Sequence, residues 1–573
     1  YVPCAKSFVI LITDGESTKD LNIPAELRDY DGDGEDPGSY ECDGSDYLDD
    51  VALWAHTTDL RADLEGTQSV ELLTVFAFGQ GSELLKKAAK NGGFQDRNGN
   101  GRPDLQEEWD EDGDGTPDAY FEAPSGNELE QTLIAAITEI LRRAASGTAV
   151  SILATSGEGE GALYQAYFLP SVFEGLREVR WIGHLQALWV DHLGNLREDT
   201  DGDGRLVYSR DEIVRFVTDP DTGETRAERY ADADGDGWAD STEPDETVDL
   251  ADLRPIWEAG KRLALRDADD RTVFTFADRD GDGHPDAGEV MSFSVDNASV
   301  LRPFLGAADL AEAQRIIRFI RGEQVAGMRD RTLTVDGSPC VWKLGDIVHS
   351  TPTVVSRPMD DYQLIYQDQS YGAYYRRWRD REVVVYVGAN DGMLHAFAGG
   401  QFHPGDDPST DQVEHGWYSG SLGEELWAFV PCNLLPHLRW LTDPDYTHVY
   451  YVDLKPKAID ARIFTPDDDH PNGWGTVLIC GMRLGGGPIA LTDDFDGNGS
   501  PETRTFRSAW FALDVTVPTD PQLLWEFTDA NLGFTTSYPA VVRVASGGTE
   551  PVSYTHLRAH ETEADLVCRL LLE

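Results

Sequence analysis

A spacing of acidic and amide side chains that recurs along the chain constrains its fold more than any other feature of the sequence. Three twelve-residue segments carry the whole pattern Asp-x-(Asp/Asn)-x-(Asp/Asn)-Gly-x5-Glu. Segments this rich in acid and glycine favour turns, so we expect them to be loops inserted between strands and helices. Their candidate ligands, at positions one, three, five, seven, nine and twelve, are Asp96, Asn98, Asn100, Arg102, Asp104 and Glu107, then Asp232, Asp234, Asp236, Trp238, Asp240 and Glu243, then Asp278, Asp280, Asp282, His284, Asp286 and Glu289.

This spacing matches what a calcium ion requires. Calcium takes six to eight oxygen ligands, and a twelve-residue loop supplies them with a glycine at position six that makes the bend. Position seven contributes only a backbone carbonyl, which explains why Arg102, Trp238 and His284 can differ. The alternative is a solvated acidic turn, but carboxylates crowded together without a cation repel one another. The sequence does not predict a pair of helices flanking each loop, as a calmodulin-like switch would require. We therefore expect calcium to order long insertions.

Four further segments begin in the same way but are incomplete. For these partial copies, calcium binding and a solvated turn stay equal alternatives. The weakest is Asp29, Asp31 and Asp33, since Pro37 occupies position nine. The other candidate ligands are Asp110, Asp112, Asp114 and Asp118 without a final Glu, Asp199, Asp201 and Asp203 with the acids Asp211 and Glu212 slightly late, and Asp494, Asp496, Asn498 and Glu502 with Thr505 at position twelve. Each segment is named below by its first residue, from the Asp29 loop to the Asp494 loop.

Acidic residues dominate the charge of the whole chain. The 104 Asp and Glu residues outnumber 47 Lys and Arg, which gives a formal net charge of −57. Such a chain repels phosphate backbones and anionic headgroups, so nucleic acid is not an expected partner. Hydrophobic residues still make up 40% of the 573 residues, enough for two or three packed domains. No apolar run approaches the roughly 20 residues of a membrane span, so none is expected here.

The start of the sequence and its cysteines constrain the fold less than the acidic segments do. Tyr1 stands in place of Met and residues 8–13 already have the pattern of an interior strand, so we expect sequence to precede them. The six cysteines form no CxxC pair and no zinc-ligand spacing. Buried free thiols and disulfides of an oxidising compartment are both open for them. They are Cys4, Cys42, Cys340, Cys432, Cys480 and Cys568.

The first region, residues 1–146, has the pattern of an α/β domain. Residues 8–13 and 72–78 are continuous apolar runs, as expected of strands buried on both faces. Ser82 can cap a helix that ends at the glycines 92–93, and a capping box at Ser125 starts a second helix that ends near residue 145.

The rest of the chain is expected to be rich in strands. Residues 147–336 form a β-rich linking region with acidic loops and one clear helix, capped by Asp309 and ended by Gly322. Residues 337–551 then alternate short strands with Gly-rich turns, which favours a β-propeller over a sandwich. Residues 552–573 abandon this pattern and look like foreign sequence. We therefore expect a multidomain chain that ends in an incomplete propeller.

Four short segments of the first region, residues 12–16, 76–79, 92–93 and 119–123, resemble the second half of a von Willebrand factor A domain. This resemblance implies a metal-ion-dependent adhesion site for magnesium in which Asp14 is one ligand. The other ligands of that family would lie before Tyr1, so the site is incomplete in this sequence. A turn or helix-capping role for Asp14 is the alternative.

Three segments of the last region, residues 344–352, 385–397 and 426–431, resemble together the propeller of the PilC/PilY family. Residues 320–323 and 329–331 resemble the linker that precedes it. The resemblance implies a type IV pilus assembly factor or pilus-tip adhesin, without catalytic activity. It also implies minor pilins and a host or surface ligand as partners, and a secreted protein on the surface, pilus tip or outer membrane of a Gram-negative bacterium.

Two other functions stay open. One is a quinoprotein dehydrogenase with pyrroloquinoline quinone and calcium, because residues 390–397 also resemble propellers of that class; the adjacent Cys-Cys pair common in such enzymes is absent from the sequence. The other is a secreted calcium-binding adhesion protein unrelated to pili. No nucleophile elbow, zinc-protease motif or phosphate loop occurs. His349, His395, His437 and His448 lie in strand-like contexts, where packing is commoner than catalysis.

Overall fold

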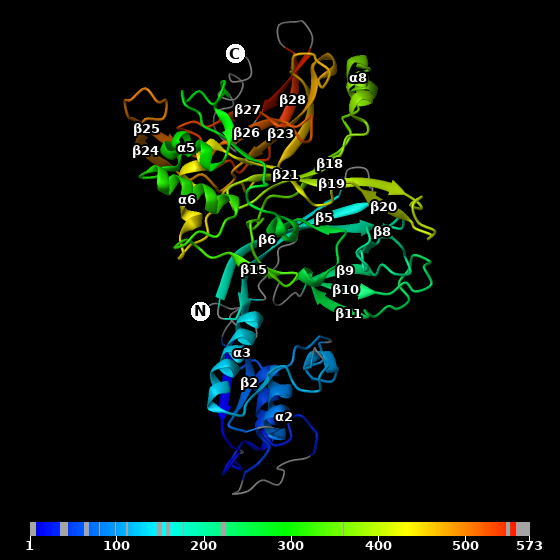
Figure 1. Cartoon of the computed structure of the whole chain (residues 1–573). Helices are drawn as coiled ribbons and strands as arrows, with labels where there is room; N and C mark the ends of the chain where they lie inside the picture. The colour runs from blue at the N-terminus through cyan, green and yellow to red at the C-terminus, as the bar shows by residue number, and fades with distance from the viewer. Residues whose placement is uncertain are drawn as a thin grey trace. The chain divides into compact units, whose positions relative to one another are not determined.

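The computed structural model describes residues 7–545 and 551–556, except for 16, 35–43, 62, 64–67, 80, 98, 111–112, 146–151, 156–160, 176, 219–224 and 359. The chain forms two compact units (Figure 1). The first comprises Tyr1–Thr148, Ser171–Glu178 and Thr218–Glu224. The second comprises Ala149–Pro170, Val179–Val217 and Thr225–Glu573, so most of the expected linking region lies in the same unit as the expected propeller.

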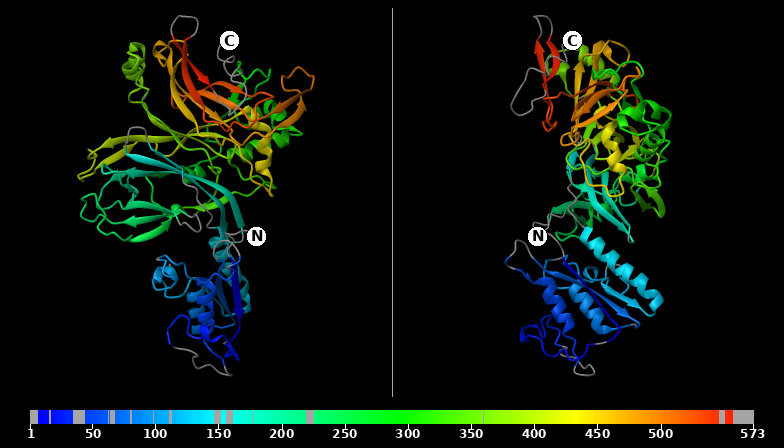
Figure 2. Two further views of the ribbon diagram at one scale, coloured as in Figure 1. Left: turned by 180° about the vertical axis from the view of Figure 1, so that it is seen from behind. Right: turned by 90° about the vertical axis from the view of Figure 1, so that its left-hand side faces the viewer.

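The first unit has the α/β character that its apolar runs predict. Its sheet has three parallel strands in the order β1-β2-β3, with Ile10 beside Leu73. Three helices pack against this sheet (Figure 2). The elements are β1 (Ser7–Thr13), α1 (Leu48–Thr57), β2 (Val70–Ala77), α2 (Glu83–Gly93), β3 (Tyr120–Ala123) and α3 (Gly126–Ala145), with 3-10 helices at Ala25–Leu27 and Gln106–Glu108.

Local signals explain where helix α2 begins and how it packs. The Ser82 hydroxyl accepts the Leu85 N–H at 3.3 Å and starts the helix as predicted. Gly92 lets the helix approach closely, because a Cβ there would lie 2.9 Å from the Ala52 Cβ and 2.8 Å from the Leu72 Cβ. The α/β class of this region is thus confirmed, while the von Willebrand factor A assignment stays an expectation.

The second unit begins with an eight-stranded sheet. Its order is β11-β10-β9-β7-β6-β5-β4, and β12 pairs with β6. The Asp199 loop joins the antiparallel neighbours β7 and β9, and the Asp232 loop joins β10 and β11. The strands are β4 (Ile152–Thr155), β5 (Ala162–Glu174), β6 (Arg177–Val190), β7 (Leu196–Arg197), β9 (Ile213–Thr218), β10 (Thr225–Tyr230), β11 (Glu246–Asp249) and β12 (Trp257–Glu258).

Helices follow this sheet and pack into the largest apolar core. Helix α6 (Leu310–Arg321) is the one predicted: Asp309 accepts the Glu312 N–H at 2.8 Å, and Gly322 ends the helix with a φ of +114°. Residues of α5 and α6 share their core with the strands that follow. The remaining elements here are α4 (Ala259–Leu265), α5 (Ala298–Leu305) and the 3-10 helices Leu250–Asp252 and Val295–Asn297.

Two runs of four antiparallel strands follow, as expected for propeller blades. The first is β17 (Thr353–Val355), β18 (Val383–Gly388), β19 (Leu394–Pro404) and β21 (Glu425–Val430). The second is β22 (Lys457–Arg462), β23 (Trp474–Gly481), β26 (Trp510–Asp514) and β27 (Gln522–Phe527). Strand β13 (Val273–Phe276) extends the first sheet beside β21 and pairs with β14 (Val290–Ser292). A strand from the expected linking region therefore completes the propeller sheet.

Smaller elements connect and extend these sheets. Strands β24 (Ile489–Asp493) and β25 (Glu502–Phe506) form a separate hairpin, with the Asp494 loop at its turn. Strand β20 (Gly416–Ser419) pairs with β19 and β8 (Arg205–Leu206). The others are β15 (Thr332–Val335), β16 (Ser338–Val341), α7 (Tyr362–Ile365), α8 (Gln369–Trp378) and the 3-10 helices Cys432–Thr442 and Pro471–Gly473.

One expectation about the tail needs correction. Residues 552–556 belong to β29 (Pro551–His556), which pairs antiparallel with β28 (Ala540–Ala545). Val552 and Tyr554 alternate with Ser553 and Thr555 in this segment, a short strand pattern that the interpretation of the tail as foreign sequence overlooked. Residues 557–573 lie outside the described residues, as do Cys4, Cys42 and Cys568. Cys340, Cys432 and Cys480 are free thiols.

Among the described residues, we find no helix with the length and apolar character needed to cross a lipid bilayer.

Candidate calcium-binding loops

All seven acidic loops share one backbone bend. In each, the N–H of the sixth-position glycine donates to the carboxylate of the first residue, over 2.7 to 3.2 Å. Each of these glycines has a positive φ, between +69° and +93°, which residues with a Cβ rarely adopt. They are Gly34, Gly101, Gly115, Gly204, Gly237, Gly283 and Gly499. The sequence template therefore identified one recurring conformation, in the partial copies as well as in the complete ones.

The fifth position is equally regular. In six loops the side-chain oxygen of the fifth residue accepts the N–H of the seventh residue over 2.7 to 2.9 Å. Asn100, for example, accepts from Arg102, and Asn498 accepts from Ser500. The sequence reasoning missed the fourth position, which is also a glycine with positive φ in every loop. The repeated dipeptides Asp-Gly and Asn-Gly could have shown it. These glycines are Gly32, Gly99, Gly113, Gly202, Gly235, Gly281 and Gly497.

Five loops bring three acidic side chains together. In each of these groups one ligand atom per residue lies within 4.8 Å of the others, close enough to share a cation. The Asp29 loop, the weakest by sequence, is among them. The groups are Asp29, Asp31 and Asp33; Asp199, Asp201 and Asp203; Asp232, Asp234 and Asp240; Asp278, Asp280 and Asp282; and Asp494, Asp496 and Glu502.

The acid that closes a loop is not always the one at position twelve. In the Asp278 loop it is: Glu289 accepts the N–H groups of Arg279 and Asp286, at 2.8 and 3.0 Å. In the Asp96 loop Glu108 has this role, accepting from Arg97 at 3.1 Å and Leu105 at 3.2 Å.

Glu107, the predicted ligand of that loop, is exposed, whereas Glu108 is buried. A 3-10 turn over Gln106–Glu108 directs the later residue inward. This shift by one residue could not be read from the spacing.

Two other loops depart from the template in similar ways. In the Asp199 loop the late acid Asp211 closes the loop, accepting from Thr200 at 3.0 Å and Val207 at 2.7 Å. In the Asp232 loop Asp240 accepts the N–H of the second residue at 2.8 Å, while the predicted Glu243 is exposed. Asp211 was noted as late but not counted among the candidate ligands.

In the Asp29 loop the closing acid comes from a helix. Asp50 of α1 accepts the N–H groups of Tyr30 and Asp31, at 2.5 and 3.1 Å. In the Asp110 loop Asp118 donates its N–H to the Trp109 carbonyl at 2.8 Å. Asn98 and Asp112 lie outside the described residues.

Burial makes several of these carboxylates costly to ionise. Asp199 and Asp211 are only 2% and 1% exposed, and this burial, with the neighbouring carboxylates, raises their pKa to about 6 and about 7. Asp232 is 3% exposed, and its Oδ1 has no hydrogen-bond partner although Oδ2 accepts from Gly237 and Arg197. A cation in these loops would offset the unfavourable burial.

Arginines connect the loops to their surroundings. Arg197, fully buried, donates to Asp232 at 2.7 Å, to Asp191 at 2.8 Å and to the carbonyl of Asp211 at 2.9 Å, so it joins the Asp199 and Asp232 loops. Arg504 of β25 donates to the carbonyl of Asp278 at 2.6 Å. Gly283 accepts the N–H of Glu526, in the second blade, at 2.8 Å. The loops are thus built into the fold.

Asp14 stands apart from these loops. It follows β1 at the carboxyl end of the strand and is exposed. It belongs to none of the groups of acidic side chains that converge in the described part of the chain.

The four histidines considered as catalytic candidates all bond within the fold. His395 lies between Asp391 and Glu425, His349 bonds to Asp453, and His448 bonds to Asp346. His437 bonds to a backbone carbonyl.

Comparison with known proteins identifies the last region. Residues 344–555 match the family model of the PilY1 beta-propeller domain. The chain is 34% identical over 250 residues to the type IV pilus biogenesis factor PilY1 of Pseudomonas aeruginosa strain UCBPP-PA14, which covers 42% of this chain and 16% of that relative. It is 32% identical over 264 residues to a PilY1 homolog of Xylella fastidiosa strain Temecula1, which covers 44% of this chain and 17% of that relative. No solved structure matches significantly.

The alignments span less than a fifth of the length of these relatives. The matched residues contain both runs of four antiparallel strands, from β17 to β27. Residues 344–555 therefore form a PilY1-type beta-propeller domain, and the chain is similar to type IV pilus biogenesis factors of the PilY1 kind.

Proposed function

We propose that this chain is part of a type IV pilus assembly factor or pilus-tip adhesin that acts at the bacterial surface without catalytic turnover. The observation that carries the proposal is the PilY1 propeller match, supported by relatives named as type IV pilus biogenesis factors. Minor pilins and a host or surface ligand are the proposed partners.

Deletion of the gene tests this role. We expect fewer surface pili and weaker attachment, both restored by the intact gene. Normal piliation and attachment in the deletion strain would refute the assembly role. Quinone-dependent alcohol oxidation by the purified protein would instead favour the dehydrogenase alternative.

Calcium is the second part of the proposal, and the loop geometry supports it. Five loops gather three acids each, and the free Oδ1 of Asp232 is a buried oxygen without a donor. Several loops, including those at Asp278 and Asp494, close antiparallel hairpins, so a bound ion would hold the two strand ends together. Millimolar extracellular calcium suits loops of this kind. The proposed role is structural ordering of the insertions.

Thermal unfolding with calcium and with a chelator tests this part. Calcium at a hundredfold excess over its dissociation constant should stabilise the protein by about 2.7 kcal/mol per site that binds only the native state. Asp280→Asn should reduce the effect, whereas Asp411→Asn, at an exposed acid outside the loops, should not. Equal unfolding midpoints in calcium and chelator, with no binding heat, would refute calcium binding.

An adhesion module in the first unit is the third part of the proposal. Its parallel sheet and the position of Asp14 at the carboxyl end of β1 support it, because open α/β sheets bind ligands at that edge. The test is magnesium affinity of the full-length protein with and without Asp14→Ala. Equal affinities would leave Asp14 as a turn residue.

A further inference from the structure

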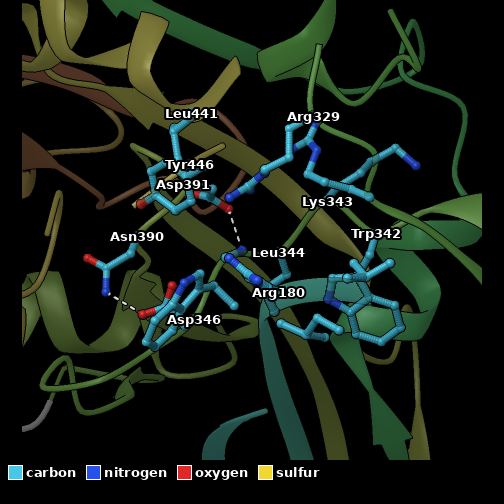
Figure 3. A pocket seen from close by; sticks show the side chains of 15 residues that line it. Arg180, Arg329, Trp342, Lys343, Leu344, Asp346, Asn390, Asp391, Leu441 and Tyr446 are labelled. Atoms are coloured by element: carbon cyan, nitrogen blue, oxygen red, sulfur yellow. Dashed lines mark hydrogen bonds between the residues drawn. The ribbon is translucent and has the colours of Figure 1, made fainter. Parts of the chain in front are cut away.

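A small pocket in the second unit gathers four basic side chains. It lies where β6, the segment before β15, residues 342–346 and the turn between β18 and β19 meet. Arg180, Arg329, Arg331 and Lys343 line it together with two acids, Asp346 and Asp391. In Figure 3, Arg329 and Lys343 lie on one side and Asn390, Asp391 and Asp346 on the other. The free space inside is about that of one water molecule.

The two acids of the pocket already have partners. The Asp391 carboxylate accepts from His395 at 3.0 Å and from the Gly345 N–H at 2.9 Å. The Asp346 carboxylate bonds to Asn390 and His448, both at 2.7 Å. Their hydrogen-bonding capacity is thus directed at groups other than the basic side chains.

Arg329 and Arg331, in contrast, keep donor groups without acceptors. Nε and Nη1 of Arg329 and Nε of Arg331 are buried without a hydrogen-bond partner. The two guanidinium groups lie over aromatic rings, that of Arg329 4.4 Å from the Tyr446 centroid and that of Arg331 3.9 Å from the Phe319 centroid. Lys343 is 4% exposed and bonds to backbone carbonyls, at 2.9 Å to Ala264. Buried donors without acceptors are rare and destabilising.

The electrostatics agree with the geometry. Burial and the positive charge of Arg329 lower the pKa of Arg331 to about 9, and burial with the charges of Arg271 and Arg331 lowers that of Lys343 to about 8. Burial likewise lowers the pKa of Arg329. Burial and mutual repulsion thus disfavour the charged forms of these side chains, and a bound anion would offset that cost.

A further sign of a ligand site is backbone strain. Trp181, which lines the pocket, has a φ of +62°, a conformation that a bulky side chain seldom adopts. Strain of this kind gathers at ligand sites, where the surrounding structure holds it.

We propose that this pocket binds a carboxylate group, held by the free N–H groups of Arg329 and Arg331. A carboxylate presents two coplanar oxygens that suit a guanidinium fork, and its small head fits the limited space better than a phosphate. The same chemistry is offered by a small free carboxylate, by the carboxyl terminus of a partner chain and by an acidic side chain of a partner.

Thermal unfolding and calorimetry of the full chain with sodium acetate test the proposal, at an ionic strength held constant with sodium chloride. Acetate should raise the unfolding midpoint more than chloride or phosphate does. Arg329→Met should weaken acetate binding by at least about tenfold, without lowering the midpoint in chloride, because no hydrogen bond of Nε or Nη1 is lost. Arg329→Lys, which keeps the charge but not the fork, should bind with intermediate strength. Arg379→Met, at an exposed arginine outside the pocket, is the matched control.

Triglycine, its carboxyl amide and an aspartate peptide capped at both ends distinguish the sources. Tighter binding of triglycine than of its amide indicates a chain terminus. Tighter binding of the aspartate peptide than of the triglycine amide indicates an acidic side chain. If neither peptide binds more tightly than the amide, the source is a small free carboxylate. No acetate effect beyond that of chloride, a larger effect of phosphate, or an acetate effect unchanged in Arg329→Met would each overturn the proposal.

Discussion

Glu425→Gln should destabilise the second unit strongly, because Glu425 holds two buried cations. Its carboxylate accepts Nε and Nη2 of Arg271, both at 2.8 Å, and both side chains are 0% exposed. It also bonds to Nδ1 of His395 at 2.8 Å. The pair of Arg271 and Glu425 joins the segment before β13 to β21, and therefore connects the linking region to the first blade.

The magnitude follows from the burial of this pair. Removing one partner of a buried ion pair leaves the other charge without compensation and costs about 3–5 kcal/mol. The chain offers a matched control in Arg302 and Asp493, a bidentate pair at 2.7 and 2.9 Å whose side chains are 30% and 25% exposed. Asp493→Asn should cost less than about 1 kcal/mol, since water screens this pair.

Urea unfolding followed by tryptophan fluorescence measures both variants. A shift of the midpoint with an unchanged slope reports a loss of stability. Arg271→Met combined with Glu425→Gln should recover part of the loss, because it removes the uncompensated charge. Equal losses in Glu425→Gln and Asp493→Asn would show that burial does not control the contribution of such pairs here.

Three further predictions address the same unit and the loops. Burial lowers the pKa of His395, but Asp391 and Glu425 outweigh this effect and raise it to about 9. The protonated His395 should therefore contribute about 3 kcal/mol to the free energy of unfolding, complete below pH 6.5 and lost as pH rises through 9. A pH series of urea midpoints in which His395→Gln changes in parallel with the wild type would contradict this. Gly283→Ala should cost more than Gly281→Ala in thermal unfolding, since its Cβ would lie 2.3 Å from the Glu526 carbonyl while the nearest atom to the other lies at 3.7 Å. Glu108→Gln should weaken calcium binding by the Asp96 loop more than Glu107→Gln does, and calorimetry showing the reverse would restore the position-twelve assignment.

Local signals in the sequence predicted much of the fold correctly. The apolar runs at 8–13 and 72–78 became parallel strands, and Ser82 and Asp309 cap the helices that they were expected to start. The acidic template located loops that share one bend, because that bend needs only residues close together in the chain. Signals of this kind act within a few residues and do not depend on the rest of the fold.

Other features depended on contacts that spacing alone does not report. One such feature is the pairing of β29 with β28. Which acid closes a loop depends on the path of the backbone after it, and at the Asp29 loop the acid is Asp50 on a helix. The pocket lined by Arg329 combines β6 with Asp391, far apart in sequence.

By itself, the sequence determined the classes of element, the acidic loops and the resemblance of residues 344–352 and 385–397 to a known propeller. Periodicity, helix capping and turn formation depend on residues that are neighbours in the chain, so a short backbone segment can adopt these structures without distant contacts. Only the tertiary structure decided that Arg271 from the linking region would meet Glu425 in the first blade, and that Arg197 would join two loops. A buried charge takes its partner from whatever the packed chain brings within reach, and that is a property of the whole fold.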